Sequence, residues 1–321
     1  MSFIVLFKTT LTAMLEILLL GACGFFLIKK KFINEEGLRV LSKLVIELIL
    51  PVFIFSQFIQ RFSFSLYRNW LFFPFLSLII SLAGLGIGII FLKIFKISTD
   101  RHEKREFLSL LMFQNSGYLP LILLATLLPT GEAQTMYIYL FLFLLGFNLA
   151  IWSFGCWFLK GESIKHFELG SLFSSPVLAT LISLLLVFLR LDRIIPATII
   201  NASDMLGKCV LPLAMIIVGG NLALIPITKM INKKAIGSVL LLKLLILPLL
   251  AFLILLNFRI SPYIGLLIIL ETAVPCATSL SLITRHYRLE DRLINQGIFF
   301  THICSLVTIP IFLCLYLMFA F

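Results

Sequence analysis

The stretch FLSLLMFQNSGYLP at residues 107–120 decides the fold, because a polar run interrupts an apolar segment of helix length. Seven mostly apolar residues lead into the polar and small residues 114–117, and Pro120 follows before the chain becomes apolar again. Glycine frees the backbone, and proline removes a hydrogen-bond donor and clashes with the preceding turn. We therefore expect the helix to break within this stretch.

A second stretch of the same kind, ETAVPCATS, lies at residues 271–279. Lipid cannot satisfy the backbone groups that a broken helix frees, so such breaks are tolerated where protein buries them or a wet cavity adjoins them. Two interrupted spans in corresponding places are also the best sequence indication of a transporter's binding site. The alternative is a pair of proline kinks whose freed groups bind neighbouring serine and threonine side chains.

The composition predicts an all-α polytopic membrane protein. The 321 residues are 61% hydrophobic and 13% charged, whereas soluble domains are roughly 45–50% apolar and about 25% charged. One helical span needs about 20 apolar residues. The apolar runs predict ten transmembrane helices, at residues 4–28, 38–59, 70–92, 107–128, 135–159, 171–189, 200–225, 235–257, 262–283 and 293–318.

The basic residues predict the orientation. Of the 26 lysines and arginines, 17 fall in connections on one side and 6 on the other. Because cytoplasmic loops are rich in Lys and Arg, we expect both termini outside, in a multi-pass protein of the cell membrane (plasma or inner). We expect the first helix to be retained, since its basic cluster follows the apolar run. We expect no nucleic-acid partner, since no soluble segment is long enough for a basic face.

A weak internal repeat accompanies the ten spans. Glu47 and Lys208 each lie four residues before the proline of a Leu-Pro pair, and they are 161 residues apart. The same offset carries Asn115 to Cys276, which joins the two interrupted stretches. Five spans in each half would make the repeat inverted, which is an architecture of many secondary transporters.

Several motifs along the whole chain resemble the auxin efflux carrier family of bacterial and plant transporters. They are LP at 50–51, NSGY at 115–118, SP at 175–176, LPLA at 211–214, GGNLA at 219–223, AVP at 273–275 and RHY at 285–287. The resemblance implies a five-plus-five inverted repeat of residues 1–160 and 161–321, in which the broken helices 4 and 9 cross. It also implies a fold shared with bile acid–sodium symporters and transport of small organic anions, such as malonate, malate or auxin-like acids.

Two departures from the family pattern bear on the site. Pro120 stands where the family usually has glycine, and the family's proline falls at the position of Ile122. The second crossover has residues 276–279 in place of an asparagine- or proline-rich run. We expect the first break to shift by part of a turn, and hydroxyl groups to replace the second substrate amide.

Asn115 is the leading substrate-binding candidate. An amide offers two donors and an acceptor without a charge, which suits a carboxylate that must be released again. Helix N-termini at the breaks would add partial positive charge. The other candidate substrate-binding residues are Gln114, Ser116, Gly117, Pro120, Pro275, Cys276, Thr278 and Ser279.

Ionisable residues inside spans are the candidates for binding a coupling ion. Glu271 lies four residues before Pro275, and we favour it as a cation ligand or proton carrier. Glu47 and Lys208 occupy equivalent places, so they form either a neutralising ion pair or, with Glu47 as a proton carrier, a coupling site. His302 is a further coupling candidate, although a single histidine in a span more often serves packing.

The remaining groups favour structural roles. Glu16 and Lys243 lie near mid-helix without a motif, and glycines 84, 86 and 88 are typical of close helix packing. The six cysteines are expected to be small buried residues, forming neither a disulfide framework nor a metal site. They are Cys23, Cys156, Cys209, Cys276, Cys304 and Cys314.

The sequence therefore predicts a secondary active transporter of small carboxylates, with an anion channel or a membrane ligand sensor as the alternative. The chain has neither a His-Glu-x-x-His sequence nor clustered aspartates, so we do not expect an enzyme. We expect no cofactor. The sequence leaves open proton or sodium coupling, the direction of flux, and whether the protein forms a homodimer.

The orientation can be tested with single cysteines in a background without reactive native thiols. Cysteines at Ser98 and Lys233 should react with reagents that reach the cytoplasm, and cysteines at Arg68 and Arg193 with impermeant reagents added outside. Labelling of both groups from one side would contradict the ten-span orientation.

Overall fold

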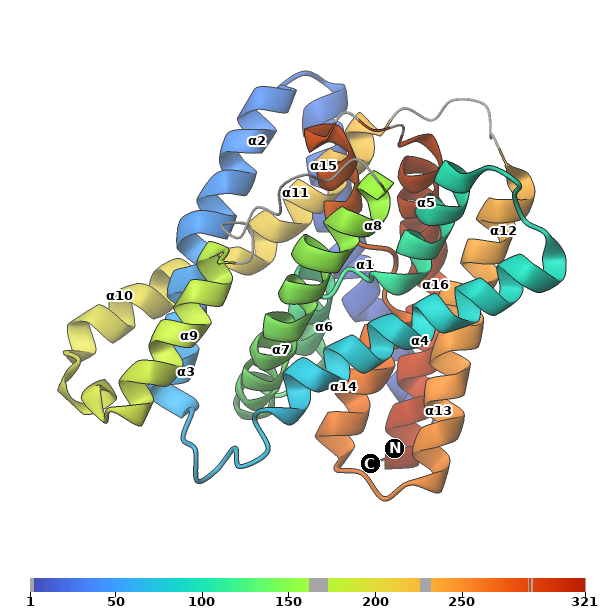
Figure 1. Ribbon diagram of the computed structural model, residues 1–321. Helices are drawn as coiled ribbons and strands as arrows, with labels where there is room; N and C mark the ends of the chain where they lie inside the picture. The colour runs from blue at the N-terminus through green and yellow to red at the C-terminus, as the bar shows by residue number, and fades with distance from the viewer. Residues whose placement is uncertain (1–2, 162–172, 226–231, 288, 290, 321) are drawn as a thin grey trace.

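The computed structural model describes residues 3–161, 173–225, 232–287, 289 and 291–320, and its named elements are all helical (Figure 1). The α-helices of the first half are α1 (Phe3–Lys29), α2 (Glu35–Leu44), α3 (Leu50–Arg61), α4 (Phe72–Phe95), α5 (Arg101–Met112), α6 (Tyr118–Leu127), α7 (Thr130–Ala150) and α8 (Cys156–Lys160). Those of the second half are α9 (Ser175–Phe188), α10 (Ala197–Gly207), α11 (Val210–Leu224), α12 (Lys233–Leu241), α13 (Leu247–Asn257), α14 (Pro262–Ala273), α15 (Ser279–His286) and α16 (Arg292–Ala320).

Six helical segments in the described residues are long and apolar enough to cross a membrane. They are Phe7–Lys29, Phe72–Phe95, Thr130–Lys160, Ala197–Leu224, Lys233–Asn257 and Arg292–Ala320. Three shorter apolar helices accompany them, at Tyr118–Leu127, Ser175–Phe188 and Pro262–Ala273. The expectation of an all-α, multi-pass membrane protein is therefore confirmed.

Two prolines explain irregular turns within helices. The π-helical turns η1 (Val45–Ile49) and η6 (Leu242–Ile246) lead directly into α3 and α13, each of which has proline as its second residue. A proline ring clashes with the carbonyl four residues earlier, and here that carbonyl lies within the wider π turn. A third π turn, η2 (Ile151–Gly155), joins α7 to α8 without a proline.

Close backbone contact holds α1 against α11. A Cβ added at Gly219 would lie 1.8 Å from the carbonyl oxygen of Gly21, and one added at Gly24 would lie 2.0 Å from that of Ile216. Membrane helices pack closely where small residues let the backbones approach, because lipid provides little hydrophobic force between helices. The α1–α11 pair is therefore a firm contact between the two halves of the chain.

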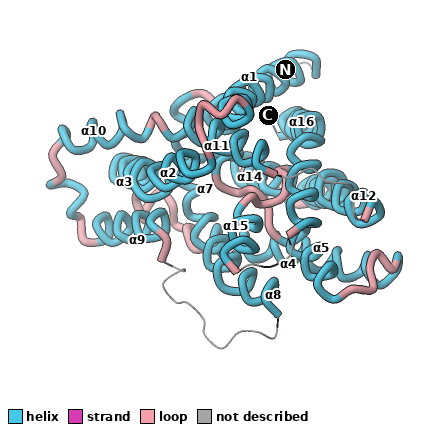
Figure 2. Tube along the Cα trace, turned by 90° about the horizontal axis from the view of Figure 1, so that it is seen from above, coloured by secondary structure: helices cyan, strands magenta, loops and turns pink. Residues whose placement is uncertain are grey.

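The other helices fall on two sides of this pair. On one side, α3 packs against α9 and α10, and Figure 2 shows these three together at one edge. On the other side, α4 packs against α5 and α7, while α16 packs against α12 and α14. Helices α1 and α16 also contact each other, and the two chain ends lie close together in Figure 1.

Contacts between connections agree with the predicted sides. The Asn232 Nδ2 donates to the Ile97 carbonyl at 3.1 Å and to Glu103 Oε1 at 2.8 Å, which brings two predicted inside connections together. The rings of Phe64 and Phe188 are 6.0 Å apart, which brings together the outer ends of α3 and α9. Residues 162–170 of the predicted inside connection 160–170, and residues 226–231 of the connection 226–234, lie outside the described residues.

The structure tests two of the packing predictions. A Cβ added at Gly84 would lie 2.2 Å from the Leu111 carbonyl oxygen, so the predicted close packing of α4 is confirmed there, whereas Gly86 faces open space. The expectation for the cysteines is correct for Cys156, Cys276 and Cys314, which are buried, and wrong for Cys23 and Cys209, which are exposed. Cys304 is intermediate.

The α1–α11 contact predicts the effect of one methyl group. Gly219→Ala should destabilise the protein by about 1–3 kcal/mol, because the added Cβ meets backbone that cannot move aside. Gly237→Ala is the matched control in α12, where no atom lies within 4 Å of the added Cβ, and it should be neutral or slightly stabilising. Thermal unfolding in detergent measures both, and equal melting temperatures would contradict the close packing.

Candidate functional site

The two interrupted stretches meet in the middle of the molecule. Gln114 and Cys276 form an isolated antiparallel β-bridge. The Asn115 amide donates to the Pro275 carbonyl at 2.8 Å, and the Ala277 amide donates to the Phe113 carbonyl at 3.0 Å. Each break therefore satisfies backbone groups of the other. The predicted interruption of both helices is confirmed.

The freed carbonyls at the end of α5 find three different donors. The Leu110 carbonyl accepts from Cys276 Sγ at 3.1 Å, and the Leu111 carbonyl accepts from Lys243 Nζ at 3.2 Å. The third donor is the backbone amide that reaches Phe113. A helix end in lipid has no water to bind its last carbonyls, so these contacts make the break tolerable.

Two consecutive residues of α16 bind the two crossing segments. Thr301 Oγ1 accepts from the Cys276 amide at 3.2 Å and donates to the Gly297 carbonyl at 2.7 Å. His302 Nε2 lies 3.1 Å from Asn115 Nδ2. Thr301 was not among the predicted site residues, because a threonine inside a helix usually bonds within its own helix, as this hydroxyl also does.

The hydrogen bonds of His302 define its tautomer. Its Nδ1 lies 2.8 Å from the Ile298 carbonyl oxygen, which can only accept, so Nδ1 carries a hydrogen. The Asn115 amide nitrogen then donates to the lone pair of Nε2. Asn115 and His302 are buried, at 6% and 7% exposure, although less completely than the groups on the other face of the crossing.

The opposite face is sealed and charged. Glu271 and Gln114 have no exposed surface, and Lys243 is 1% exposed. No hydrogen-bond partner among the described residues reaches either carboxylate oxygen of Glu271, either polar atom of the Gln114 side chain, or the Ser116 hydroxyl. Glu271 nevertheless interacts electrostatically with Lys243 and lies beside Gln114 and Ser116. The side chains of Glu271, Lys243, Gln114 and Ser116 thus lie near one another without hydrogen bonds of ideal geometry between them.

The expectation from the sequence that Lys243 has a purely structural role is therefore incomplete. Lys243 lies in no sequence motif, yet its Nζ lies at the crossing and donates to the Leu111 carbonyl at the end of α5. An indication was present in the sequence, because Lys243 is an ionisable residue in an apolar span, five residues before a Leu-Pro proline. Glu16, the other residue without a motif, is exposed on α1.

Glu47 and Lys208 do not pair with each other. Lys43 Nζ lies 3.9 Å from Glu47 Oε2, and Lys208 Nζ lies 3.0 Å from Asp204 Oδ2, in both cases one turn apart on the same helix. Both candidate side chains lie largely on the molecular surface. The predicted neutralising pair is wrong, because a local partner one turn away was available to each charge.

A small polar cavity adjoins the second break. It has a volume of about 30 Å³ and is lined by Thr278, Asn221, Ser281 and Arg285, among others. That volume holds one or two water molecules, which is too small for an organic anion. A larger cavity of about 490 Å³ lies at the ends of α13 and α16, far along α16 from the crossing.

The remaining candidates have structural positions around the breaks. Gly117 precedes the first residue of α6, and Pro120 is a buried residue in the first turn of α6, so the helix resumes before the proline. Thr278 precedes α15, whose first residue is Ser279. The helix N-termini at Tyr118 and Ser279 therefore both lie next to the crossing, where their partial positive charge favours an anion.

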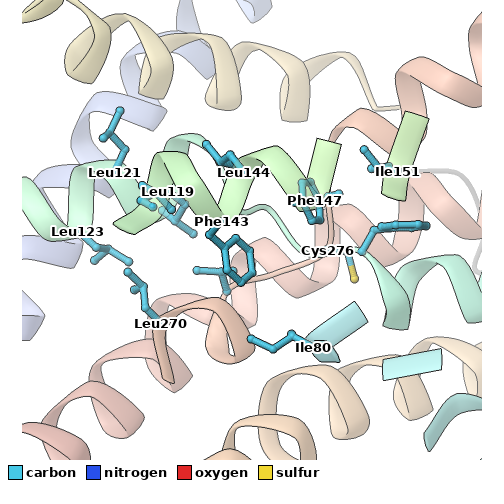
Figure 3. Close-up of a cluster of buried hydrophobic side chains, with 14 of the residues drawn as sticks. Ile80, Leu119, Leu121, Leu123, Phe143, Leu144, Phe147, Ile151, Leu270 and Cys276 are labelled. Carbon is cyan, nitrogen blue, oxygen red and sulfur yellow. The ribbon is translucent and has the colours of Figure 1, made fainter. Parts of the chain in front are cut away.

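An apolar wall supports the crossing. Figure 3 shows a buried cluster that contains Cys276 together with Leu119, Leu121 and Leu123 of α6, Phe143 and Phe147 of α7, and Leu270 of α14. These side chains are buried, so the polar crossing is enclosed by packed hydrocarbon. Electrostatic interactions at the crossing are therefore stronger than they would be in water.

A family model described as membrane transport protein matches residues 9–168 and 162–313. The chain belongs to this family. The resemblance to the auxin efflux carriers is thereby confirmed. The family assignment makes the protein a membrane transport protein in its general class, and such proteins are generally not enzymes.

One curated relative is similar over part of the chain. It is an uncharacterized transporter of Schizosaccharomyces pombe, with 27% identity over 117 residues. The match covers 36% of this chain and 25% of that protein, so the similarity spans about a quarter of the relative's length.

The buried charges at the crossing predict a coupled double mutant. Lys243→Met leaves Glu271 as an isolated buried charge, and Glu271→Gln does the same to Lys243, so each should destabilise the protein. The double variant should recover about 0.5–3 kcal/mol of the summed loss, as interacting neighbours do. The measurement is the free energy of unfolding in detergent, for the unaltered protein, the two single variants and the double variant.

The exposed pair Lys43 and Glu47 provides the control cycle. Lys43→Met and Glu47→Gln should give small losses that add within about 0.5 kcal/mol, because solvated pairs contribute little. Strictly additive losses for Lys243 and Glu271 would show that their charges do not interact.

Proposed function

We propose that this protein is a secondary active transporter that moves small organic anions by alternating access at the crossing of its broken helices. The observation that carries the proposal is the antiparallel contact between Gln114 and Cys276. Interrupted helices that meet inside a membrane protein form the substrate sites of many secondary transporters. Membership of the membrane transport protein family supports the general class.

The proposed architecture has ten spans in two inverted halves, residues 1–160 and 161–321, with both termini outside the cell membrane. The described helices follow one another within each of the ten expected spans, and the two termini lie at the same end of Figure 1. The excess of lysine and arginine in the predicted inside connections supports the orientation.

The proposed substrate position is the Asn115 face of the crossing. This face is slightly less buried than the other, offers an uncharged amide, and is flanked by the N-termini of α6 and α15. Asn115 makes its side-chain bond with His302 and not with a helix end, so its amide is not a helix cap. A carboxylate bound here would meet donors without a permanent positive charge, which permits release.

The cavity beside Thr278 supports a cycle with movement. Because its volume of about 30 Å³ is too small for an organic anion, an anion passes this side of the crossing only if helices separate. Glu271 and Lys243 are the proposed neutralised charges of the sealed face, which stays closed while the Asn115 face opens. Flux by this route is carrier-like, because the site is not a continuous pore.

Two measurements test the function. A thermal-shift screen of purified protein against organic acids should reveal stabilisation by small carboxylates, since a ligand of the folded state raises the melting temperature. Counterflow in proteoliposomes should show exchange of a preloaded acid. Dissipation of the gradient without exchange would instead indicate a channel, and binding without flux would indicate a sensor.

Substitution of Asn115 separates a binding role from a structural one. Asn115→Ala should weaken acid binding by roughly ten- to a hundredfold, because a hydrogen bond to a charged group contributes about 1.5–3 kcal/mol. The unliganded melting temperature should change little, because the backbone bond to Pro275 remains. Asn115→Asp should bind more weakly still, because it places a negative charge against the anion. Normal binding by the Asp variant would remove Asn115 from the site.

A further inference from the structure

The two nitrogen atoms of the His302 ring have unequal freedom. The partner of Nδ1 is the Ile298 carbonyl at 2.8 Å, and a carbonyl has no hydrogen to give. Nδ1 therefore carries a hydrogen in every state that keeps this bond. A change in protonation can occur at Nε2 alone, and Nε2 is the atom that faces Asn115.

The orientation of the Asn115 amide is fixed by the state of Nε2. While Nε2 holds a lone pair, its partner must be a donor, and Asn115 Nδ2 lies 3.1 Å away. When Nε2 binds a proton it becomes a donor, so its partner must be an acceptor. Asn115 can meet this requirement by rotating its amide so that Oδ1 replaces Nδ2. Each protonation state therefore specifies one amide orientation.

The rotation changes what Asn115 offers to an anion. With neutral His302, the amide has one N–H left and directs Oδ1 away from the ring, and no donor among the described residues reaches that oxygen. With protonated His302, Oδ1 faces the ring, both N–H groups are free, and a positive charge lies behind them. A carboxylate meets one free N–H beside a carbonyl oxygen in the first arrangement, and two free N–H groups beside a positive charge in the second, so the second binds it more tightly.

From this geometry we propose that His302 is the proton-binding site of the transporter, and that proton binding turns the Asn115 amide to accept the substrate carboxylate. The proposal rests on the proposed function and adds the coupling ion to it. Proton and anion then bind together, and each increases the affinity for the other by the same factor. The proton comes from water in the opened cavity and leaves with the anion, so no further reactant is needed.

Other titratable groups on the elements packed against α16 do not supply this charge. Inside the spans these groups are Lys8, Glu16 and Cys23 of α1, Lys243 of η6, and Tyr263 and Glu271 of α14, together with Cys276 at the crossing. Further charged groups stand at the helix ends, at Lys29 of α1, residues 101–106 of α5, Lys233 and Lys234 of α12, and Arg285 and His286 of α15. In the described part of the chain, the imidazole interacts with Ile298 and Asn115 and with none of these charges. The bound anion is thus the counter-charge of the imidazolium.

The first test uses ligand-free protein with nitrogen-15 histidine, observed by nuclear magnetic resonance in detergent. The His302 signals, identified by their loss in His302→Gln, should show a protonated Nδ1 and an unprotonated Nε2 at alkaline pH. In Asn115→Asp the carboxylate can only accept, so Nε2 should be protonated at the same pH. A hydrogen on Nε2 in the unaltered protein at alkaline pH would overturn the proposal.

The second test measures the affinity for malonate and for indole-3-acetate between about pH 7.5 and 8.5, where the carboxyl groups of both acids stay ionised. In the unaltered protein, binding should weaken by about tenfold per pH unit wherever one proton is taken up with the anion. His302→Gln keeps a hydrogen-bonding side chain without a titrating group, so its affinity should not depend on pH. Replacing sodium with choline in the buffer should leave the acid affinity of both proteins unchanged.

The matched control is His286→Gln, because His286 is an exposed histidine at the end of α15. This variant should keep the pH dependence of the unaltered protein. Binding whose pH dependence survives in His302→Gln, or that requires sodium, would overturn the proposal while leaving the transport function in place. If neither acid binds at any pH, the proposed function is contradicted. The resonance experiment would then still test the protonation of His302 Nε2 on its own.

Discussion

The structure depends on backbone groups that lipid cannot satisfy. Where α5 and α14 end inside the molecule, their carbonyls and amides have no water and no further helical turn. The antiparallel contact of Gln114 with Cys276 satisfies part of this need, and α16 and η6 supply the rest through Thr301 and Lys243. Several helices pack around the crossing because the two helix breaks leave backbone groups that would cost free energy if they stayed without hydrogen bonds.

The same crossing separates two chemical environments. Successive side chains of an extended segment point to opposite sides, so Asn115 faces His302 while Gln114 lies beside Glu271. One side is slightly less buried and carries Asn115 and His302, and the other is fully buried around Glu271 and Lys243. The proposed binding surface and its buried support thus follow from the alternation of side chains along one extended segment.

Firm and changeable contacts are also distributed unequally. Helices α1 and α11 contact each other through backbone atoms at glycines. A glycine has no side chain that could rearrange, so this contact is rigid. The contact of α16 with the first break includes a side-chain hydrogen bond between His302 and Asn115, and we propose that this bond reverses its polarity without moving the backbone. In the proposed cycle, the binding surface changes while the helix framework stays intact.

The sequence by itself determined the helical class, the two breaks and Asn115 as their central side chain, because apolar run length, glycine, proline and polar interruptions act locally. Glu271 was also predictable, since an acidic residue in an apolar span is costly wherever it lies. Lys243 and Thr301 needed the tertiary structure, because their partners Leu111 and Cys276 are distant in the chain. The expected pair of Glu47 with Lys208 failed for the same reason: an equivalent place in two repeats does not set a distance, whereas a partner one helical turn away does.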